Sequence, residues 1–364
     1  IGIGYFAGRD ITTGAQNVAI GANAMYRNTT GDFNVAIGPT AMSGASLTGN
    51  DNVAIGRDAA DALAGGACNI AMGMNALGAA TEPDYNVAIG YQPMGGVTTG
   101  DAQSNVAIGV NALYGAAGTS GNHNVAIGTS AADALTTGAC NIAIGQDAFG
   151  ASSGSAAHDN IVIGRIAGGG ITNQNVQFNV LIGVAAGCGH STASGGQNIA
   201  IGTDSLRAFT TGNTNIALGQ YAGCALSSGS GNIYQGCYSG ACNTTGNQNV
   251  SLGLCAMRCS STGCRNVAIG VVAMGNSATG GSTGQGSHNV AIGSNAGQHI
   301  TTGCNNIAIG MTVASALNTA LDTISLGHKA GLSNSGNHKV INIGCCANVT
   351  TLSLIHISEP RDRG

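Results

Sequence analysis

The chain has 364 residues, of which 62 are glycine and 7% are charged, and its formal net charge is −4. Low net charge with 43% hydrophobic residues argues against electrostatically driven disorder, and the glycines lack the three-residue period of collagen. The 11 Lys and Arg residues are scattered singly, which argues against a nucleic-acid partner, and no apolar run approaches the roughly 20 residues of a membrane-spanning helix.

A five-residue motif, Asn-[Val/Ile]-x-[Ile/Leu/Met]-Gly, recurs through the chain. A half copy, Ile1-Gly-Ile-Gly4, comes first, and because no Met or charged leader precedes it we expect the sequence to begin inside a longer protein or after processing. Weaker copies come last, at Thr323 and Val340. Copies with Asn first and Gly fifth begin at Asn17, Asn34, Asn52, Asn69, Asn86, Asn105, Asn124, Asn141, Asn160, Asn179, Asn198, Asn215, Asn232, Asn249, Asn266, Asn289 and Asn306, with Gln235 as the one departure at the fourth place.

The spacing of the motif identifies the coil. The interval from Asn17 to Asn34 is the commonest and recurs in eleven of the 18 spacings up to Val340, while the slightly longer interval from Asn86 to Asn105 recurs in five. A unit this short excludes paired helices, which need about 30 residues, while Val18-Ala-Ile20 is typical of a short strand and Gly21 permits a bend. The sequence therefore predicts an all-β fold, a parallel β-solenoid of about 20 coils with mostly about 17 residues per coil, over residues 1–347.

We number the positions of each coil from 1 at the repeated Asn. The Asn column is expected to form a ladder of side-chain amides along the stack. The Val/Ile and Ile columns, positions 2 and 4, are expected to fill the coil interior together with positions 8 and 9. Position 3, which is Ala in 13 of the 17 full copies, would then face outward. A small apolar stripe there indicates packing against a second copy in a cyclic homo-oligomer; alternatively, Ala is merely tolerated outside a narrow coil.

The pattern Asn-Val-Ala-Ile-Gly-x-x-Ala resembles the head repeat of trimeric autotransporter adhesins and the repeats of phage tail fibres and related bacterial surface fibres. The resemblance implies a homotrimer of parallel β-solenoids, extracellular, on a virion tail or a bacterial cell surface. We therefore predict a structural or adhesive fibre segment, without enzymatic activity or cofactor, whose partners are its own copies and a cell-surface glycan or host receptor. Corner insertions near residues 101–104, 120–123 and 275–288 are candidate contact loops.

Other reactive residues give weaker signals. Among the 12 cysteines, Cys242 and Cys259 share a coil position one repeat apart, which allows a disulfide or stacked thiols. No Cys-x-x-Cys occurs, so we predict no metal site. His123, His158 and His288 fall in variable corners just before the Asn column, and nothing around them marks a catalytic arrangement, so we predict no catalytic residue.

Two other functions stay open. One Ile-Gly-x-x-Ala per coil resembles the hexapeptide repeat of left-handed β-helix acyltransferases, but those enzymes need three hexads per coil. A monomeric β-solenoid with threonine columns could bind ice, although Thr12 and Thr29 are followed by Leu47 and Ala64 in the same column.

Residues 348–364 depart from the repeat. The segment Leu352-Ser-Leu-Ile-His-Ile-Ser-Glu-Pro-Arg361 resembles the translation of a transposase adapter used in sequencing libraries. We therefore expect this non-repeat tail to be a read-through artefact, with the gene truncated there.

Overall fold

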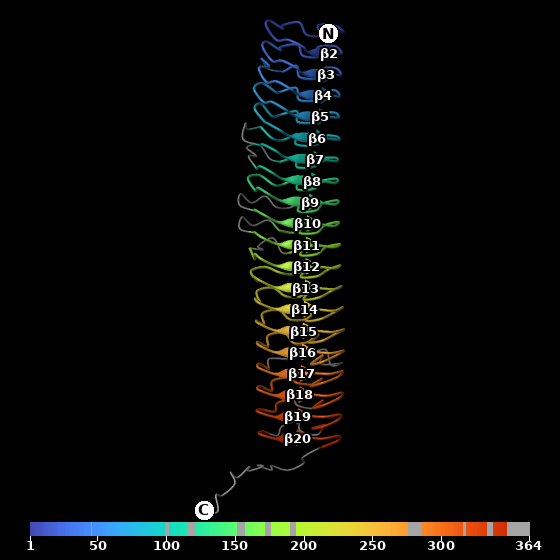
Figure 1. Ribbon diagram of the computed structural model, residues 1–364, viewed down its shortest axis with the longest axis vertical. Helices are drawn as coiled ribbons and strands as arrows, with labels where there is room; N and C mark the ends of the chain where they lie inside the picture. The colour runs from blue at the N-terminus through green and yellow to red at the C-terminus, as the bar shows by residue number, and fades with distance from the viewer. Residues whose placement is uncertain are drawn as a thin grey trace, which may run out of the picture. The chain divides into compact units, whose positions relative to one another are not determined.

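The computed structural model describes residues 1–44, 46–98, 102–115, 121–150, 157–171, 176–189, 194–275, 286–315, 318–332 and 338–347. The chain divides into two compact units, Ile1–Asn198 and Ile199–Gly364. Each unit is a parallel β-solenoid in which successive strands stack on one another (Figure 1). The predicted all-β solenoid and its usual coil length are confirmed, and the predicted tail lies outside the described residues.

In the first unit each coil contributes one strand of two or three residues. Neighbouring strands pair in parallel and in register, so that Val18 lies beside Val35 and Ala19 beside Ala36. The strands are β1 (Gly2–Ile3), β2 (Val18–Ile20), β3 (Val35–Ile37), β4 (Val53–Ile55), β5 (Ile70–Met72), β6 (Val87–Ile89), β7 (Val106–Ile108), β8 (Val125–Ile127), β9 (Ile142–Ile144), β10 (Ile161–Ile163) and β11 (Val180–Ile182).

The second unit repeats this pattern, with Ile216 beside Ile233 and Ala217 beside Tyr234. Its strands are β12 (Ile199–Ile201), β13 (Ile216–Leu218), β14 (Ile233–Gln235), β15 (Val250–Leu252), β16 (Val267–Ile269), β17 (Val290–Ile292), β18 (Ile307–Ile309), β19 (Ile324–Leu326) and β20 (Ile341–Ile343).

The glycine at position 5 ends each full strand and is required by the stacking. Gly21 has a φ of 131°, in a region that residues with a side chain rarely adopt. A Cβ added to Gly21 would lie 2.6 Å from the carbonyl oxygen of Gly38 in the next coil. The motif therefore keeps glycine here for two independent reasons, backbone conformation and close approach of the next coil.

Three other corners of the coil use left-handed backbone, in most coils at residues other than glycine. In the first full coil Asn23, Met25 and Phe33 have φ values of 57°, 48° and 60°, and the corresponding residues of other coils recur in this region. Left-handed backbone costs a residue with a side chain about 1–2 kcal/mol. Contacts with the next coil offset that cost: the Met25 N–H donates to the Ala41 carbonyl at 2.9 Å.

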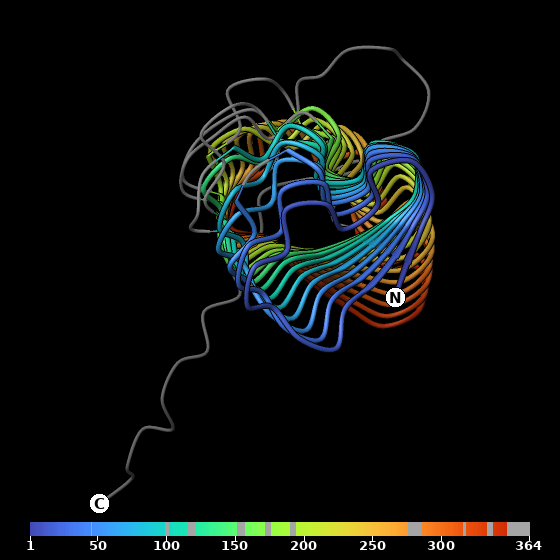
Figure 2. The same ribbon diagram turned by 90° about the horizontal axis from the view of Figure 1, so that it is seen from above.

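The interior of the coil is lined by small residues, and here one prediction is wrong. Ala19 and Ala36 at position 3 are buried, with exposed fractions of 1% and 0%, whereas Val18 and Ile20 on either side of Ala19 are only partly buried. Alanine therefore points into the coil, and Val and Ile point outward. Positions 8 and 9 do fill the interior, as predicted. Figure 2 shows the successive turns of each unit end-on.

The physical reason is the size of the coil. So short a turn of chain must hold the side chains of several corners, among them Ala24, Met25 and Asn28, all fully buried. A β-branched side chain at position 3 would compete with the Met or Leu of position 9 for the same space. The alternation of the strand showed that its two faces differ, but both faces are apolar, so it did not show which one lies inside.

The predicted ladder of asparagines is confirmed. The side-chain oxygen of Asn34 accepts the backbone N–H of Asn52 at 2.9 Å and its side-chain N–H at 3.1 Å. The side-chain amide of Asn52 also donates to the Gly66 carbonyl at 2.8 Å. Each buried amide thus satisfies backbone groups of its neighbours, which would otherwise lose their hydrogen bonds on burial.

Candidate functional site

The outward side chains of the strands form an apolar surface on each unit. We call the side chains at positions 2 and 4 of β2–β11, and separately those of β12–β20, the Val/Ile face of each unit. Throughout both sets these residues are Val, Ile, Leu or Met, with Gln235 as the one exception among the described strands. Several are well exposed, including Ile37 at 36% and Ile70 at 38%.

Many of the other exposed large hydrophobic side chains lie beside this face. They occupy the last position of a coil, just before the repeated Asn, or position 6, just after the strand. Phe33, Tyr85 and Phe178 at the last position are 52%, 63% and 54% exposed, and Leu254 and Met311 at position 6 are 49% and 53% exposed. Positions 2 and 4 are therefore consistently apolar, whereas the two flanking positions are apolar in some coils and polar in others, such as Asp51 and Thr129. The sequence prediction of an outward Ala stripe missed this surface because it assigned the two strand faces the wrong way round.

A small aromatic cluster lies on the first coils. The Arg9 guanidinium lies over the rings of Phe6 and Tyr26, 5.1 and 4.5 Å from their centroids. Tyr5 packs on Phe6, with ring centroids 3.9 Å apart. An open hollow of about 510 Å³ adjoins them, lined by Tyr5, Phe6, Asn23, Tyr26, Arg27, Thr40, Ser43 and Gly44. Its lining combines ring faces with hydroxyl, amide and guanidinium groups.

The three predicted contact loops are described only at their ends. Residues 101, 116–120 and 276–285 lie outside the described set. The flanking residues bond to neighbouring coils: the Gln103 N–H donates to Asn122 Oδ1 at 2.7 Å, and the His123 N–H donates to the Gln103 carbonyl at 3.0 Å. The Cys264 N–H donates to Ser287 Oγ at 3.1 Å. The described ends thus take part in the inter-coil bonding.

The residue two places before the repeated Asn, which is position 16 of the usual coil, has a role that the sequence reasoning missed. Its side chain often accepts the backbone N–H of the same position one coil earlier: Asp32 Oδ1 from Ala15 at 2.6 Å, His158 Nδ1 from Ala139 at 3.1 Å, and Cys264 Sγ from Asn247 at 3.3 Å. The recurrence of Asp, Asn, Ser, His and Cys at this corner was the available signal. This bond gives His158 and Cys264 structural roles.

All twelve cysteines are free thiols. Cys242 and Cys259 stack as the shared coil position predicted. The pKa of the Cys259 thiol is raised, first because burial disfavours the thiolate and then because the side chain of Cys242 lies beside it. The pair is therefore present as stacked thiols, one of the two arrangements that the spacing allowed.

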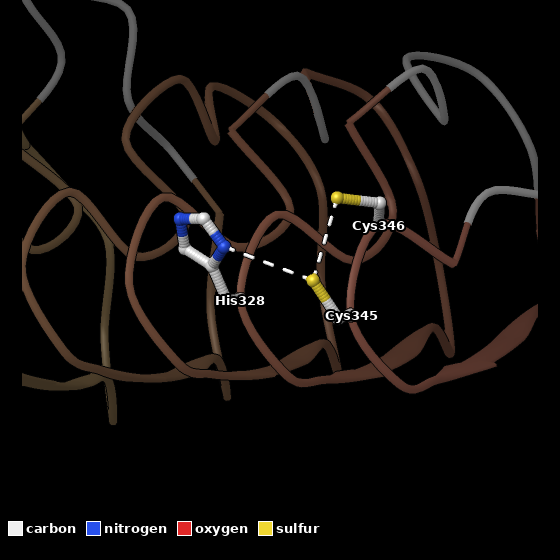
Figure 3. A group of neighbouring side chains, drawn as sticks. All are labelled: His328, Cys345 and Cys346. Atoms are coloured by element: carbon white, nitrogen blue, oxygen red, sulfur yellow. Dashed lines mark hydrogen bonds between the residues drawn. The ribbon is translucent and has the colours of Figure 1, made fainter.

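The last described coils bring two cysteines and a histidine together, a group that the sequence reasoning did not find (Figure 3). Cys345 Sγ lies 3.5 Å from Cys346 Sγ and 3.9 Å from His328 Nδ1. Both cysteines are exposed and His328 is partly buried. The available signal was the interval between His328 and Cys345, which equals the usual coil length and places them at the same position of adjacent coils.

The electrostatics of this group follow from its two thiols. The pKa of Cys345 is raised, chiefly because the Cys345 thiol shares a hydrogen bond with Cys346, and then because two neighbouring thiolates would repel. The ammonium group of Lys329 acts in the opposite direction and lowers that pKa.

Within the described residues no helix is long and apolar enough to cross a membrane. No protein-family model, curated protein or solved structure matches the chain.

Proposed function

We propose that this chain is a shaft or head segment of an extracellular homotrimeric fibre, carried on a phage tail or a bacterial surface and used for attachment. The observation that carries the proposal is the Val/Ile face.

The proposed segment acts mechanically. Its stacked coils, joined by the asparagine ladder and by backbone hydrogen bonds, form a stiff spacer.

The extent of the Val/Ile face supports an assembled state. At about 4.8 Å per strand, the ten strands β2–β11 of the first unit form a strip about 45 Å long and about 10 Å wide. Soluble monomers rarely expose contiguous apolar patches larger than a few hundred Å². In addition, the apolar character persists in strand after strand, although a solvent-facing position would be free to accept polar residues.

The proposed occupant of this face is the same face of another copy of the chain. Identical residues recur at each coil, so identical chains can align their strips side by side around a common axis. The preference for three copies comes from the resemblance to trimeric fibre repeats. This interface replaces the Ala stripe proposed from the sequence, because the alanines lie inside the coil.

The test is the mass of the chain in solution, measured by light scattering after size exclusion. We expect a trimer for the wild type. Replacing Ile20 and Ile37 by Glu, at outward positions of neighbouring coils, should give a folded monomer, because these side chains are only partly buried within one chain. The matched control places Glu at Thr13 and Thr30, exposed corners of neighbouring coils.

Each outcome decides something. A trimer that persists in the control and dissociates in the Ile variant supports the proposed interface. A wild-type monomer, shown by circular dichroism to be folded, would contradict it and favour the alternative of a monomeric binding module such as an ice-binding solenoid. The same trimer in both variants would place the interface elsewhere.

For attachment, we propose that the hollow beside Tyr5, Phe6 and Tyr26 contacts a glycan. Exposed aromatic rings flanked by polar groups suit a ligand that is apolar on its ring face and polar at its hydroxyls. A labelled fibre carrying Tyr26→Ala should lose binding on a glycan array, while Tyr114→Ala, which removes an exposed tyrosine at the same coil position outside the hollow, should not. Equal binding by both variants would exclude this site.

A further inference from the structure

We propose that His328, Cys345 and Cys346 form a binding site for a thiophilic metal ion such as Zn²⁺. The three residues lie on adjacent coils of the second unit, and their ligand atoms all lie within 4.8 Å of one another. This inference is independent of the proposed fibre function.

The ligand types suit this class of ion. Thiolate sulfur and imidazole nitrogen are the donors that bind Zn²⁺ most often in proteins, and they also favour other soft ions over Mg²⁺ or Ca²⁺. A set of two sulfurs and one nitrogen leaves a fourth position of a tetrahedral ion for water or another ligand.

The separations suit a single ion. Bonds of about 2.0–2.3 Å to one tetrahedral Zn²⁺ place its ligand atoms roughly 3.5–4 Å apart. The observed separations are 3.5 Å between the two sulfurs and 3.9 Å between Cys345 Sγ and His328 Nδ1. The third separation, between Cys346 Sγ and the His328 ring nitrogen, is also within 4.8 Å, so side-chain rotations of small size would bring all three atoms into bonding range.

The solenoid holds the site in place. Cys346 N–H donates to the His328 carbonyl at 2.8 Å, which fixes the coil carrying the cysteines against the coil carrying the histidine. Adjacent residues with trans peptide geometry have Cα atoms about 3.8 Å apart, shorter than the about 4.4–6.8 Å of ordinary disulfides. Metal binding thus suits Cys345 and Cys346 better than a bond between their sulfurs.

Binding is an exchange of protons for the ion. Each thiol releases its proton to solvent as its sulfur–metal bond forms, and His328 binds through the lone pair of neutral Nδ1. Two protons leave for one divalent ion, so the net charge of the site is conserved. The bound cation also relieves the repulsion between the two thiolates.

The experiment is a titration of the full chain with Co²⁺, a spectroscopic substitute for Zn²⁺, in the presence of a phosphine reductant. We expect one equivalent to bind with thiolate-to-cobalt charge-transfer absorption, and Zn²⁺ to displace it. Cys345→Ser combined with Cys346→Ser should abolish the absorption, and His328→Gln should weaken binding at least tenfold. The chain itself shows that these corners accept such residues, with Gln220 and Ser294 at position 6 and Asn295 at position 7.

The control is Cys242→Ser combined with Cys259→Ser, which removes a stacked thiol pair that belongs to no three-residue ligand group among the described residues. This double variant should bind one equivalent of Co²⁺, as the wild type does. Absence of charge-transfer absorption in the wild type would overturn the proposal. So would undiminished binding in the Cys345/Cys346 variant, or loss of the absorption in the control.

Discussion

The ring of Tyr234 occupies the space that a side chain at Gly240 would fill. A Cβ on Gly240 would lie 2.4 Å from ring atoms Cδ1 and Cε1 of Tyr234, and one on Gly223 would lie 2.8 Å from Cδ2. Tyr234 stands at position 3, where most coils have Ala, and the two glycines stand at position 9, where many coils have Met or Leu. Large and small residues have thus been exchanged between two columns of the core.

This exchange predicts a strong coupling between the two positions. Gly240→Met should lower the free energy of unfolding by about 1–3 kcal/mol, because the core around Tyr234 is already full. Tyr234→Ala alone should cost about 3–5 kcal/mol through the cavity it leaves. The double variant restores the common Ala and Met pair and should be more stable than the sum of the single effects predicts.

The measurement is urea unfolding of all four proteins in a double-mutant cycle. Met25 has a φ of 48° at the same coil position, so the backbone of Gly240 at 60° is compatible with Met. Additive effects would show that Tyr234 and Gly240 do not compete for space.

The asparagine ladder predicts a second stability effect. Asn141 is buried, donates to Asn124 Oδ1 at 3.1 Å and to the Ala157 carbonyl at 2.7 Å, and accepts the Asn160 N–H at 3.1 Å. Asn141→Ala should lower the unfolding free energy by about 2–3 kcal/mol, because it leaves buried groups without partners. Thermal unfolding checks this, with Asn318→Ala, at an exposed corner, as control. Equal melting temperatures for the two variants would contradict a structural role for the ladder.

Asp133 predicts a dependence of stability on pH. Burial raises the pKa of its carboxyl, a hydrogen bond with Ser130 opposes the rise, and the nearby charge of Asp147 adds to it. A carboxyl with a higher pKa in the folded state favours folding below its unfolded pKa of about 3.9, and this contribution is lost as the pH rises through the folded value. At neutral pH the ionised Asp133 carboxylate therefore destabilises the folded state.

Asp133→Asn should accordingly stabilise the protein at neutral pH, and its advantage should disappear near pH 3–4 or so, where the wild-type carboxyl is protonated. Unfolding midpoints measured across this range check the sign. Asp51→Asn, at an exposed corner, is the control for the loss of one charge. An advantage that grows as the pH falls would contradict the assignment.

The pair of thiols predicts that metal binding strengthens with rising pH. The pKa of Cys345 is raised by its hydrogen bond with Cys346 and by repulsion between the thiolates, and Lys329 only partly opposes this rise. The metal ion must therefore displace the proton of this thiol when it binds. With two protons released, the apparent Co²⁺ affinity should rise by up to about 100-fold per pH unit below the thiol pKa values. A flat profile between pH 6 and 8 or so would contradict thiolate ligation.

The repeat made much of the fold predictable. The spacing of the asparagines set the coil, and Asn34 and Asn52 bond along the stack as their column implied. Alternation did not predict which face of the strand points into the coil, because Val18, Ala19 and Ile20 are all apolar. The narrow interior accommodates the small side chain of alanine better than Val or Ile. Volume exchange between Tyr234 and Gly240 also depends on contacts across the coil that the sequence does not display.

The cysteine–histidine group illustrates another limit. Short intervals such as Cys-x-x-Cys describe ligands on one loop, but a solenoid brings residues together at intervals of a whole coil. His328 and Cys345 become neighbours because of the stacking register, whereas Cys346 lies beside Cys345 simply because it is the next residue in the chain. A search for ligands by coil position would have found all three.

Because successive coils present the same groups to their neighbours, the chain can gain or lose whole coils during evolution. Within the first unit, deleting residues 69–85 would bring Asn52 against Asn86 and Gly56 against Gly90, which are the same pairs of groups that meet in the intact stack. Gain or loss of a complete coil with the common core residues is therefore nearly neutral, while gain or loss of part of one breaks the register of the asparagine and glycine columns. Genes of this kind can vary in length by recombination between repeats, in steps of one coil, because the resulting chain needs no contact that the stack does not already contain.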